Sequence, residues 1–278
     1  MHPLTFLRRV LMNRIDKKFH DLKSKKKPAF IPFITAGDPD LETTKALILE
    51  FEKRGADIIE LGIPFSDPIA DGPIIQASYY RTLVRGTKVA QILDMVSDLR
   101  CKSDIPIVSM VSYSTVFKGG CQAFIEKVCK AGLDGLTIPD MPVEENSNLF
   151  EVAKNHDFKI VCFVAPTTTD ERMSLITQYS QGFLYYISVV GITGTRDKLP
   201  EDVLQNINKL KKMTKTPIAV GFGVSTPEQA KLIGGIADGV IVGSAIIKEI
   251  ERYLNEPSEK LVNKVGEFVG QLIKGAKG

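Results

Sequence analysis

Apolar residues along the chain follow two alternating periodicities. Eight short runs are rich in β-branched or aromatic residues and lack polar alternation, which is typical of strands buried on both faces. Between them, polar turns lead into segments with apolar residues at helical spacing, such as Ile92, Leu93, Val96 and Leu99. The eight runs cover residues 30–35, 57–61, 105–111, 135–138, 159–164, 184–188, 217–221 and 239–242.

Regular alternation of strand and helix predicts a parallel sheet with helical crossovers. Eight such units in 278 residues favour closure into a (β/α)8 TIM barrel. A doubly wound open sheet is the alternative, but the turn after the first run is TAGDP at residues 35–39, without the glycine pattern of dinucleotide-binding open sheets. An amphipathic segment with Ile15, Phe19 and Leu22 on one face predicts an additional N-terminal helix that closes the barrel floor.

Two helix starts carry capping signals that agree with this fold. Asp40 precedes a helical pattern that opens at Leu41, and Thr226 is followed by Pro227 and Glu228. A short polar side chain just before the helix can accept a main-chain N–H bond, and proline suits the first turn. We therefore expect helices to begin after both residues.

Composition limits the class of protein. With 44% hydrophobic and 25% charged residues the chain is globular, and no apolar run reaches the roughly 20 residues of a membrane span. Arg8 and Arg9 follow the first apolar residues, opposite to the order of a secretory signal, so we expect a cytoplasmic protein. The four cysteines lack zinc or redox spacing and the three histidines are scattered, which predicts reduced thiols and no metal site.

Basic residues are concentrated at the N-terminus. Residues 1–27 hold nine Lys or Arg and two Asp. The cluster at residues 23–27 has no interleaved aromatic residues, which favours a solvated helix end over a nucleic-acid site.

Three small-residue turns follow the sixth, seventh and eighth runs, namely GITG at 191–194, GFGVS at 221–225 and GSA at 243–245. Glycine allows main-chain amides to approach an anion, and Ser244 at a helix start directs the positive end of the helix dipole toward it. In TIM barrels the loops after strands seven and eight often bind phosphate. Because these turns contain no Arg or Lys, we expect amides and a hydroxyl, without a salt bridge, to bind a small phosphorylated substrate.

The stretch ELGIPFSDPIADGP, residues 60–73, places two carboxylates near the end of the second strand. Glu60 could be half of a buried ion pair and Asp71 an ordinary turn aspartate, yet both are candidates for acid-base catalysis. The sequence offers no lysine at a strand end for a Schiff base and no Ser-His-Asp or Cys-His arrangement. Acid-base chemistry on the carbon skeleton of a phosphate ester is therefore the favoured hypothesis.

The motifs ELGIPFSDPIADGPIIQ, PFITAGDP, PDMPVEE, GITG, GFGVS and GSAIIK resemble the tryptophan synthase alpha subunit family. The likeness runs from about residue 12 to the C-terminus, and MNRI at 12–15 is similar to the start of family members. We therefore expect residues 1–11 to be an N-terminal extension and residues 12–278 a single (β/α)8 barrel domain.

The resemblance implies a lyase of the last stage of tryptophan biosynthesis. Its reaction is the retro-aldol cleavage of indole-3-glycerol phosphate to indole and glyceraldehyde 3-phosphate, with no cofactor in this chain. By similarity, Asp71 accepts the indole N–H proton, while Glu60 protonates the ring carbon and assists deprotonation of the side-chain hydroxyl. The loop after the second strand and the GITG loop would be lids. The resemblance also assigns substrate binding to Phe33, Tyr185, Thr193, Gly194, Gly223, Gly243 and Ser244, with Thr193 orienting Asp71.

The resemblance further implies a partner, the tryptophan synthase beta subunit, in an alpha2beta2 heterotetramer. The beta subunit carries pyridoxal phosphate and condenses indole with serine. Candidate contacts lie at residues 64–68 and 141–144, and Asp140 is expected near both the interface and the pocket. Named individually, the candidate contacts are Pro64, Asp67, Pro68, Met141 and Pro142.

Four positions depart from the family pattern. Ser112 and Ser114 stand where tyrosine and asparagine are usual, Val108 where glycine is common, and Val189 where arginine is often found. Two hypotheses follow: a working lyase, or a cleavage-impaired subunit that acts mainly as an allosteric activator of the beta subunit. A phosphate-binding barrel enzyme of another pathway is the third.

Overall fold

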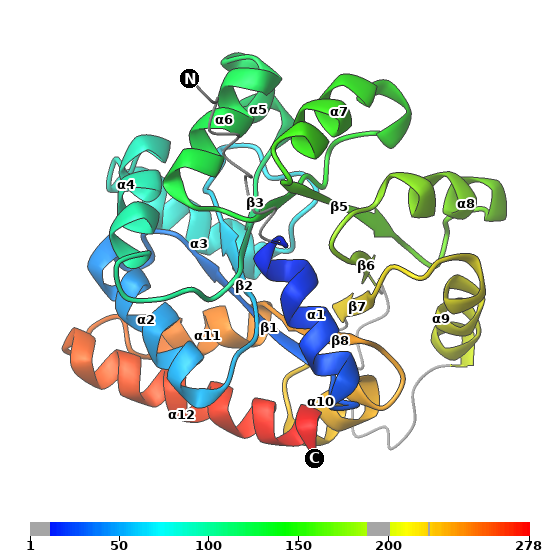
Figure 1. Cartoon of the computed structure of the whole chain (residues 1–278). Coiled ribbons are helices and arrows are strands. Elements are labelled where there is room, and N and C mark those ends of the chain that lie inside the picture. The colour runs from blue at the N-terminus through cyan, green and yellow to red at the C-terminus, as the bar shows by residue number, and fades with distance from the viewer. Residues whose placement is uncertain (1–11, 188–200, 222) are drawn as a thin grey trace, which may run out of the picture.

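The computed structural model describes residues 12–187, 201–221 and 223–278, and in it eight parallel strands close into a barrel in sequence order (Figure 1). Each strand pairs with its neighbours, and β8 returns to β1 through the register Ile31 with Ile241. The closed sheet confirms the TIM barrel, and the doubly wound alternative is wrong. The strands are β1 Ala29–Thr35, β2 Ile59–Gly62, β3 Ile107–Met110, β4 Gly135–Thr137, β5 Lys159–Val164, β6 Leu184–Ile187, β7 Ile218–Gly221 and β8 Gly239–Val242.

Helices surround the barrel, most of them in the crossovers between successive strands (Figure 1). Their apolar faces pack on the outer side of the strands, as the helical spacing predicts. The helices are α1 Arg14–Ser24, α2 Leu41–Arg54, α3 Pro73–Val84, α4 Val89–Leu99, α5 Tyr113–Lys118, α6 Cys121–Ala131, α7 Ser147–Asn155, α8 Asp170–Tyr179, α9 Glu201–Met213, α10 Pro227–Gly234, α11 Ser244–Arg252 and α12 Ser258–Lys277, with a 3-10 turn at Val143–Glu145.

Both predicted helix caps are confirmed. The Asp40 carboxylate accepts a hydrogen bond from the Thr43 N–H at 2.7 Å. The Thr226 hydroxyl accepts from the Gln229 N–H at 3.3 Å, and the Gln229 side chain accepts from the Thr226 N–H at 3.3 Å. These bonds satisfy amides that have no partner within the first turn of α2 and α10.

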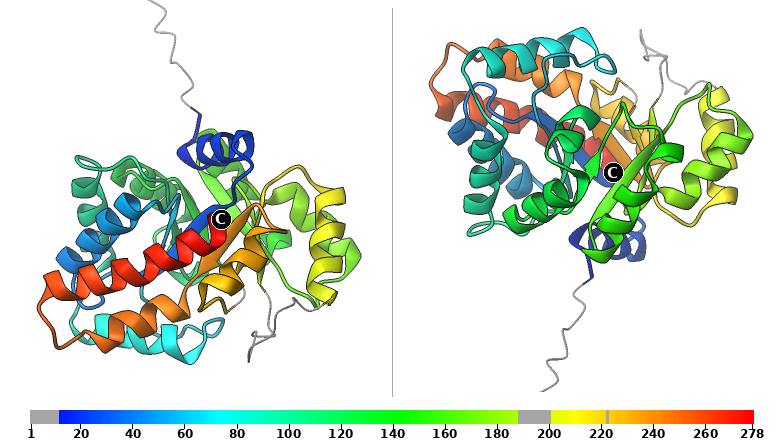
Figure 2. Two further views of the ribbon diagram at one scale, coloured as in Figure 1. Left: turned by 90° about the horizontal axis from the view of Figure 1, so that it is seen from below. Right: turned by 90° about the horizontal axis from the view of Figure 1, so that it is seen from above.

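The predicted N-terminal helix is confirmed as the floor of the barrel. Figure 2 shows α1 at one end of the barrel and α3 at the opposite end. The centres of the Phe19 and Phe183 rings lie 5.7 Å apart. The Ile15 side chain packs so close to Gly135 of β4 that a Cβ added to this glycine would lie only 3.2 Å from it. The helix and the inward side chains of the strands form one apolar group, the inner cluster, whose buried members are Ile15, Phe19, Leu22, Ala29, Ile31, Ile58, Val108, Val161, Phe183, Ala219 and Ile241.

Several further expectations can be compared with the described residues. All four cysteines are free thiols. The side chains of Lys23 and of residues 25–27 are exposed, as a solvated helix end requires. Within the described ranges, no helix is long and apolar enough to cross a membrane, and no group of three metal-ligating side chains occurs. Residues 1–11, the predicted extension, lie outside the described residues.

Candidate active site

Glu60 points into the barrel from β2. Side chains two residues apart on a strand share a face, and Ile58 belongs to the inner cluster. In the strand register Glu60 lies beside Phe33 of β1 and Val108 of β3. Its side chain is almost fully buried, and the Thr137 hydroxyl of β4 donates a hydrogen bond to Oε1 at 3.2 Å.

Burial raises the pKa of Glu60 from 4.5 to about 8. The Thr137 hydrogen bond lowers that pKa and the nearby charge of Asp71 raises it, but the loss of hydration is the largest cause. Val108, one of the departures from the family pattern, contributes to this apolar environment because it flanks Glu60 on β3. At neutral pH the Glu60 side chain is therefore a carboxylic acid that can donate a proton.

Gly62 makes room for aromatic side chains at the same end of the barrel. A Cβ at this position would lie 2.7 Å from the Phe33 ring and 2.9 Å from the Tyr79 hydroxyl. Burial raises the pKa of Tyr79, and the charges of Asp71 and Glu60 raise it further. The Tyr79 side chain thus carries a neutral hydroxyl near both carboxylates. The sequence analysis did not identify Tyr79 as a site residue.

Asp71 lies in the loop between β2 and α3. Its N–H donates to the Pro68 carbonyl at 3.1 Å, and the Gln76 side chain donates to the Asp71 carbonyl at 2.7 Å. These bonds hold the main chain of the turn. Burial, with a smaller contribution from the charge of Asp140, raises the pKa of Asp71 from 3.8 to about 6. Asp71 is therefore mostly ionised at neutral pH and can accept a proton.

Asp140 is held at the edge of this site by two donors. The Ser112 hydroxyl donates to Oδ2 at 2.7 Å and the Tyr113 N–H donates to Oδ1 at 2.8 Å. The hydroxyls of Ser112 and Ser114 are 3.0 Å apart. Asp71, Ser112 and Asp140 line one small cavity of about 20 Å³. The expected position of Asp140 near the pocket is confirmed, and the serine departures form part of its hydrogen-bond network.

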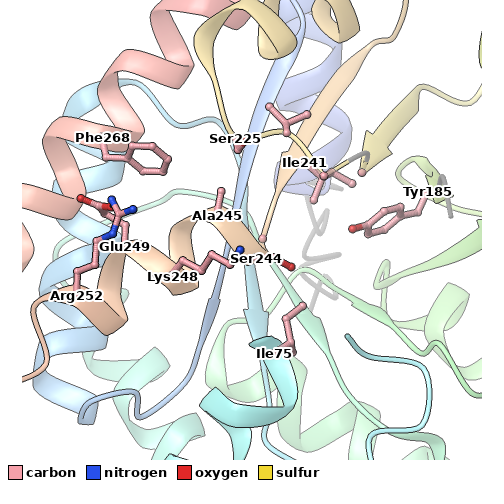
Figure 3. A pocket seen from close by; sticks show the side chains of 14 residues that line it. Ile75, Tyr185, Ser225, Ile241, Ser244, Ala245, Lys248, Glu249, Arg252 and Phe268 are labelled. Carbon is pink, nitrogen blue, oxygen red and sulfur yellow. The ribbon is translucent and has the colours of Figure 1, made fainter. Parts of the chain in front are cut away.

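A larger cavity of about 590 Å³ opens at the ends of β7 and β8. Gly223, Ser225, Gly243 and Ser244 line it, and Ser244 begins α11, as expected from the sequence. Figure 3 shows the Ser244 hydroxyl and the Tyr185 ring facing each other across this space. A helix N-terminus beside glycine-rich turns is suited to binding an anion.

Two basic side chains of α11 also line the larger cavity. Lys248 follows Ser244 by one helical turn, and its amine points toward Ser244 in Figure 3. Arg252 lies one turn further and donates to Glu249 at 2.6 Å. The cavity lining therefore includes basic side chains in addition to the amides and hydroxyl expected from the sequence. The i, i+4 spacing of Ser244 and Lys248 was the signal that could have revealed the amine.

Tyr185 of β6 connects the larger cavity with the two carboxylates. Its ring lies over Gly221, where a Cβ would be 2.7 Å from ring carbon Cε2. Burial raises the pKa of Tyr185, and the charges of Glu60 and Asp71 raise it further. Glu60 and Asp71 do not themselves line the larger cavity: Asp71 lines the small one, and Glu60 is buried inside the barrel.

Other predicted site residues have different outcomes. Phe33 is buried between Gly62 and Gly243, so it supports the site from within the barrel. Thr193 and Gly194 lie outside the described residues, as does Val189.

The candidate partner contacts divide by exposure. Pro64 was named as a contact; it is buried in this chain, so its side chain offers little surface, and the contact stays a prediction. Asp67 is exposed, while Pro68, Met141 and Pro142 are partly exposed.

Comparison with known proteins agrees with this geometry. Residues 19–277 match the family model described as tryptophan synthase alpha chain. The tryptophan synthase alpha chain of Thermoanaerobacter sp. (strain X514) is 46% identical over 261 residues, 94% of this chain and 98% of that relative. The alpha subunit structure from Legionella pneumophila str. Paris is 35% identical with a TM-score of 0.87, over 96% of this chain and 99% of that one.

A chain of the tryptophan synthase complex from Pyrococcus furiosus is also similar. It is 37% identical with a TM-score of 0.78, and the match covers 88% of this chain and 98% of that chain. The hypothesis of a barrel enzyme from an unrelated pathway is therefore wrong. The chain belongs to the tryptophan synthase alpha chain family.

Proposed function

We propose that Glu60 and Asp71 are the acid-base pair with which this chain cleaves indole-3-glycerol phosphate to indole and glyceraldehyde 3-phosphate. This retro-aldol cleavage is the activity of the family. One observation carries the residue assignment: two neighbouring carboxylates have pKa values of about 8 and about 6. At neutral pH one is a proton donor and the other a proton acceptor, which is how paired carboxylates divide acid and base roles.

The proposed reaction returns both side chains to their starting forms. Asp71 accepts the indole N–H as positive charge develops on the ring, while Glu60 donates its proton to the ring carbon that carries the side chain. The Glu60 carboxylate then takes the proton of the adjacent side-chain hydroxyl. The carbon–carbon bond breaks, its electron pair returns to the indole ring, Asp71 gives its proton back to the ring nitrogen, and the hydroxyl carbon becomes the aldehyde. General acid-base catalysis of this kind contributes about 10² to 10⁴-fold.

We assign the phosphate of the substrate to the larger cavity. Gly223, Gly243 and Ser244 offer main-chain amides and a hydroxyl there, and Lys248 adds a positive charge. Tyr185 separates this end from the carboxylates and would contact the carbon skeleton. Thr193 and Gly194 complete the proposed substrate contacts by resemblance alone.

We further propose a beta-subunit partner and an alpha2beta2 assembly in the cytoplasm. Support comes from the similar chain of the Pyrococcus furiosus tryptophan synthase complex. Asp67, Pro68, Met141 and Pro142 have side-chain surface available for such a contact, and Ile69 beside them is 86% exposed. In this family pyridoxal phosphate belongs to the beta chain, so the chemistry of the alpha reaction rests on side chains.

Release of indole from indole-3-glycerol phosphate tests the proposal. The chain is assayed alone and with a cognate beta subunit, and Glu60→Gln supplies the background. Indole release well above that background supports the lyase. If release stays at the background while the chain still raises the rate at which beta converts indole and serine, the activator hypothesis suggested by Ser112 and Ser114 replaces it.

A further inference from the structure

We propose that Ser112 and Asp140 act as a positioning pair for Asp71: the Ser112 hydroxyl fixes a second carboxylate beside Asp71, and this fixed charge sets the pH range in which Asp71 accepts a proton. The consequence for catalysis rests on the role proposed for Asp71 above. The electrostatic coupling between Asp140 and Asp71 does not depend on that role, because it is present in the folded chain without substrate.

The geometry of Asp140 supports a fixed charge. Each carboxylate oxygen has its own donor, Ser112 Oγ at 2.7 Å from Oδ2 and the Tyr113 nitrogen at 2.8 Å from Oδ1. Two donors on two oxygens restrain both the position and the rotation of the group, and bonds to an ionised acceptor are the stronger kind. Where relatives usually have tyrosine, this chain has a side chain short enough to reach Asp140 from the start of α5.

The surroundings of Asp71 allow this charge to act on it. Asp71, Ser112 and Asp140 line the same small cavity, whose volume of about 20 Å³ is close to the space of a single water molecule. Asp71 is partly buried, so a like charge acts on it more strongly than it would in bulk water, although Asp140 itself is exposed and its charge is partly screened. Burial is the largest cause of the raised pKa of Asp71, and the charge of Asp140 is the second.

The other titratable groups near Asp71 come from three different elements. Glu60 on β2 is protonated at neutral pH, because its pKa is about 8. The Tyr79 hydroxyl on α3 and the Tyr185 hydroxyl on β6 are neutral, because burial raises the pKa of both. Asp67 of the same loop also lines the small cavity and is exposed, as Asp140 is, but its charge is not among the causes that raise the pKa of Asp71. Asp140 is therefore the restrained anion whose removal should matter most.

The direction of the effect follows from repulsion. The negative charge on Asp140 disfavours a second negative charge on Asp71, so Asp71 keeps its proton to a higher pH. A proton acceptor must be ionised, so kcat/KM should rise as pH increases through about 6, the pKa of Asp71. Removing the charge of Asp140 should extend activity to more acidic pH.

Carbon-13 NMR titration of side-chain carboxyls tests the coupling without requiring catalysis. The Asp71 signal is assigned with Asp71→Asn in the full-length chain. Asp140→Asn should lower the Asp71 titration midpoint by about half a pH unit or more. Ser112→Ala should shift it in the same direction by less, since the Tyr113 N–H still holds Asp140. Ser112→Thr, which keeps the hydroxyl, should restore the wild-type midpoint.

Ser114→Ala should shift the Asp71 midpoint by less than Ser112→Ala, because the Ser114 hydroxyl contacts Ser112 and does not itself bond Asp140. An Asp71 midpoint that is the same in wild type and in folded Asp140→Asn would overturn the proposal. One claim is the positioning of Asp71 by Ser112 and Asp140, and the other is the role of Asp71 as proton acceptor. The acid limb of the pH profile of kcat/KM, measured on the same variants, separates them. A shifted midpoint with an unshifted acid limb would support the positioning pair and overturn Asp71 as the proton acceptor.

Discussion

The two ends of the barrel bury side chains equally well but for opposite purposes. At the floor, Phe19 and Ile15 of α1 pack against inward apolar residues of the strands, and burial stabilises the fold. At the opposite end, Glu60 is buried at 2% exposure in the same barrel interior, and burial raises its pKa to about 8. At the floor the loss of water stabilises the fold, while at the opposite end it raises the proton affinity of Glu60.

The same scaffold therefore separates stability from chemistry. The floor can be optimised for packing because nothing has to enter it. The open end must keep carboxylates out of water, which costs stability, and must leave cavities beside them. Substitutions at the two ends should therefore change different measured quantities.

Glu60→Gln should give the largest effect and move activity and stability in opposite directions. Loss of the proton donor should reduce kcat by about 10² to 10⁴-fold. In the wild type, the unfolded state loses the Glu60 proton near pH 4.5, while the folded state holds it up to about pH 8. Stability from this group is thus complete below pH 4.5 and is lost as pH rises through 8. The variant should be more stable than wild type at pH 8.5, on the order of 3 kcal/mol, with little difference at pH 4.

Urea unfolding of both chains at pH 4 and pH 8.5, together with indole release, measures both parts. Thr137→Val is an informative companion, because it removes the hydrogen bond to Glu60 and keeps the carboxyl group. Equal stability of wild type and Glu60→Gln at pH 8.5 would contradict the buried acid described here.

Phe19→Ala should give the largest effect at the floor. Phe19 is 5% exposed and contacts the Phe183 ring, so removing its ring leaves a cavity between α1 and the strands. We expect a loss of about 3 to 5 kcal/mol in the free energy of unfolding. At a temperature where the variant is still folded, kcat/KM should stay within about twofold of wild type. A large loss of kcat without a loss of stability would break the separation between the two ends.

The features that could be predicted from the sequence also differ between the two ends of the barrel. The floor could be predicted because its information is local and periodic: Ile15, Phe19 and Leu22 share one helical face, and each of the eight strands is an apolar run. Glu60 and Asp71 were recognisable because carboxylates beside a buried strand conflict with the local pattern. The turns after β7 and β8 were predicted as an anion site because glycine lets main-chain amides approach an anion and serine at a helix start offers a hydroxyl.

The remaining contacts depend on distances between elements that are far apart in sequence. Thr137 reaches Glu60 only because barrel closure brings β4 near β2, and nothing in its own strand marks it as a donor. The network of Ser112 and Asp140 joins residues 28 positions apart. The burial of Pro64 was not predicted, because a proline in a polar turn gives no sign of burial. Such facts follow from packing, which the sequence pattern does not specify.

Lys248→Met should give a smaller effect, confined to phosphate binding. The amine is on an exposed side chain that lines the larger cavity, so its contribution is screened by water. We expect KM for indole-3-glycerol phosphate to rise about five- to tenfold, roughly 1 kcal/mol, with kcat within about twofold. Steady-state kinetics of indole release measure both constants. Lys231→Met, an exposed lysine on α10 that does not line the cavity, should leave KM unchanged.

Asp40→Ala should give the smallest effect and shows that position at the open end does not by itself confer function. Asp40 caps the N-terminus of α2, at the same end of the barrel as the carboxylates, yet it lines neither cavity. Its side chain accepts from the Thr43 N–H at 2.7 Å, so the loss should be about 1 kcal/mol of unfolding free energy. Asp40→Asn should recover most of it, since asparagine caps comparably. Both variants should keep wild-type kcat and KM, because capping stabilises α2 without contacting the substrate. A change in KM comparable to that of Lys248→Met would instead place α2 in the binding site and weaken the division between packing and chemistry within the open end.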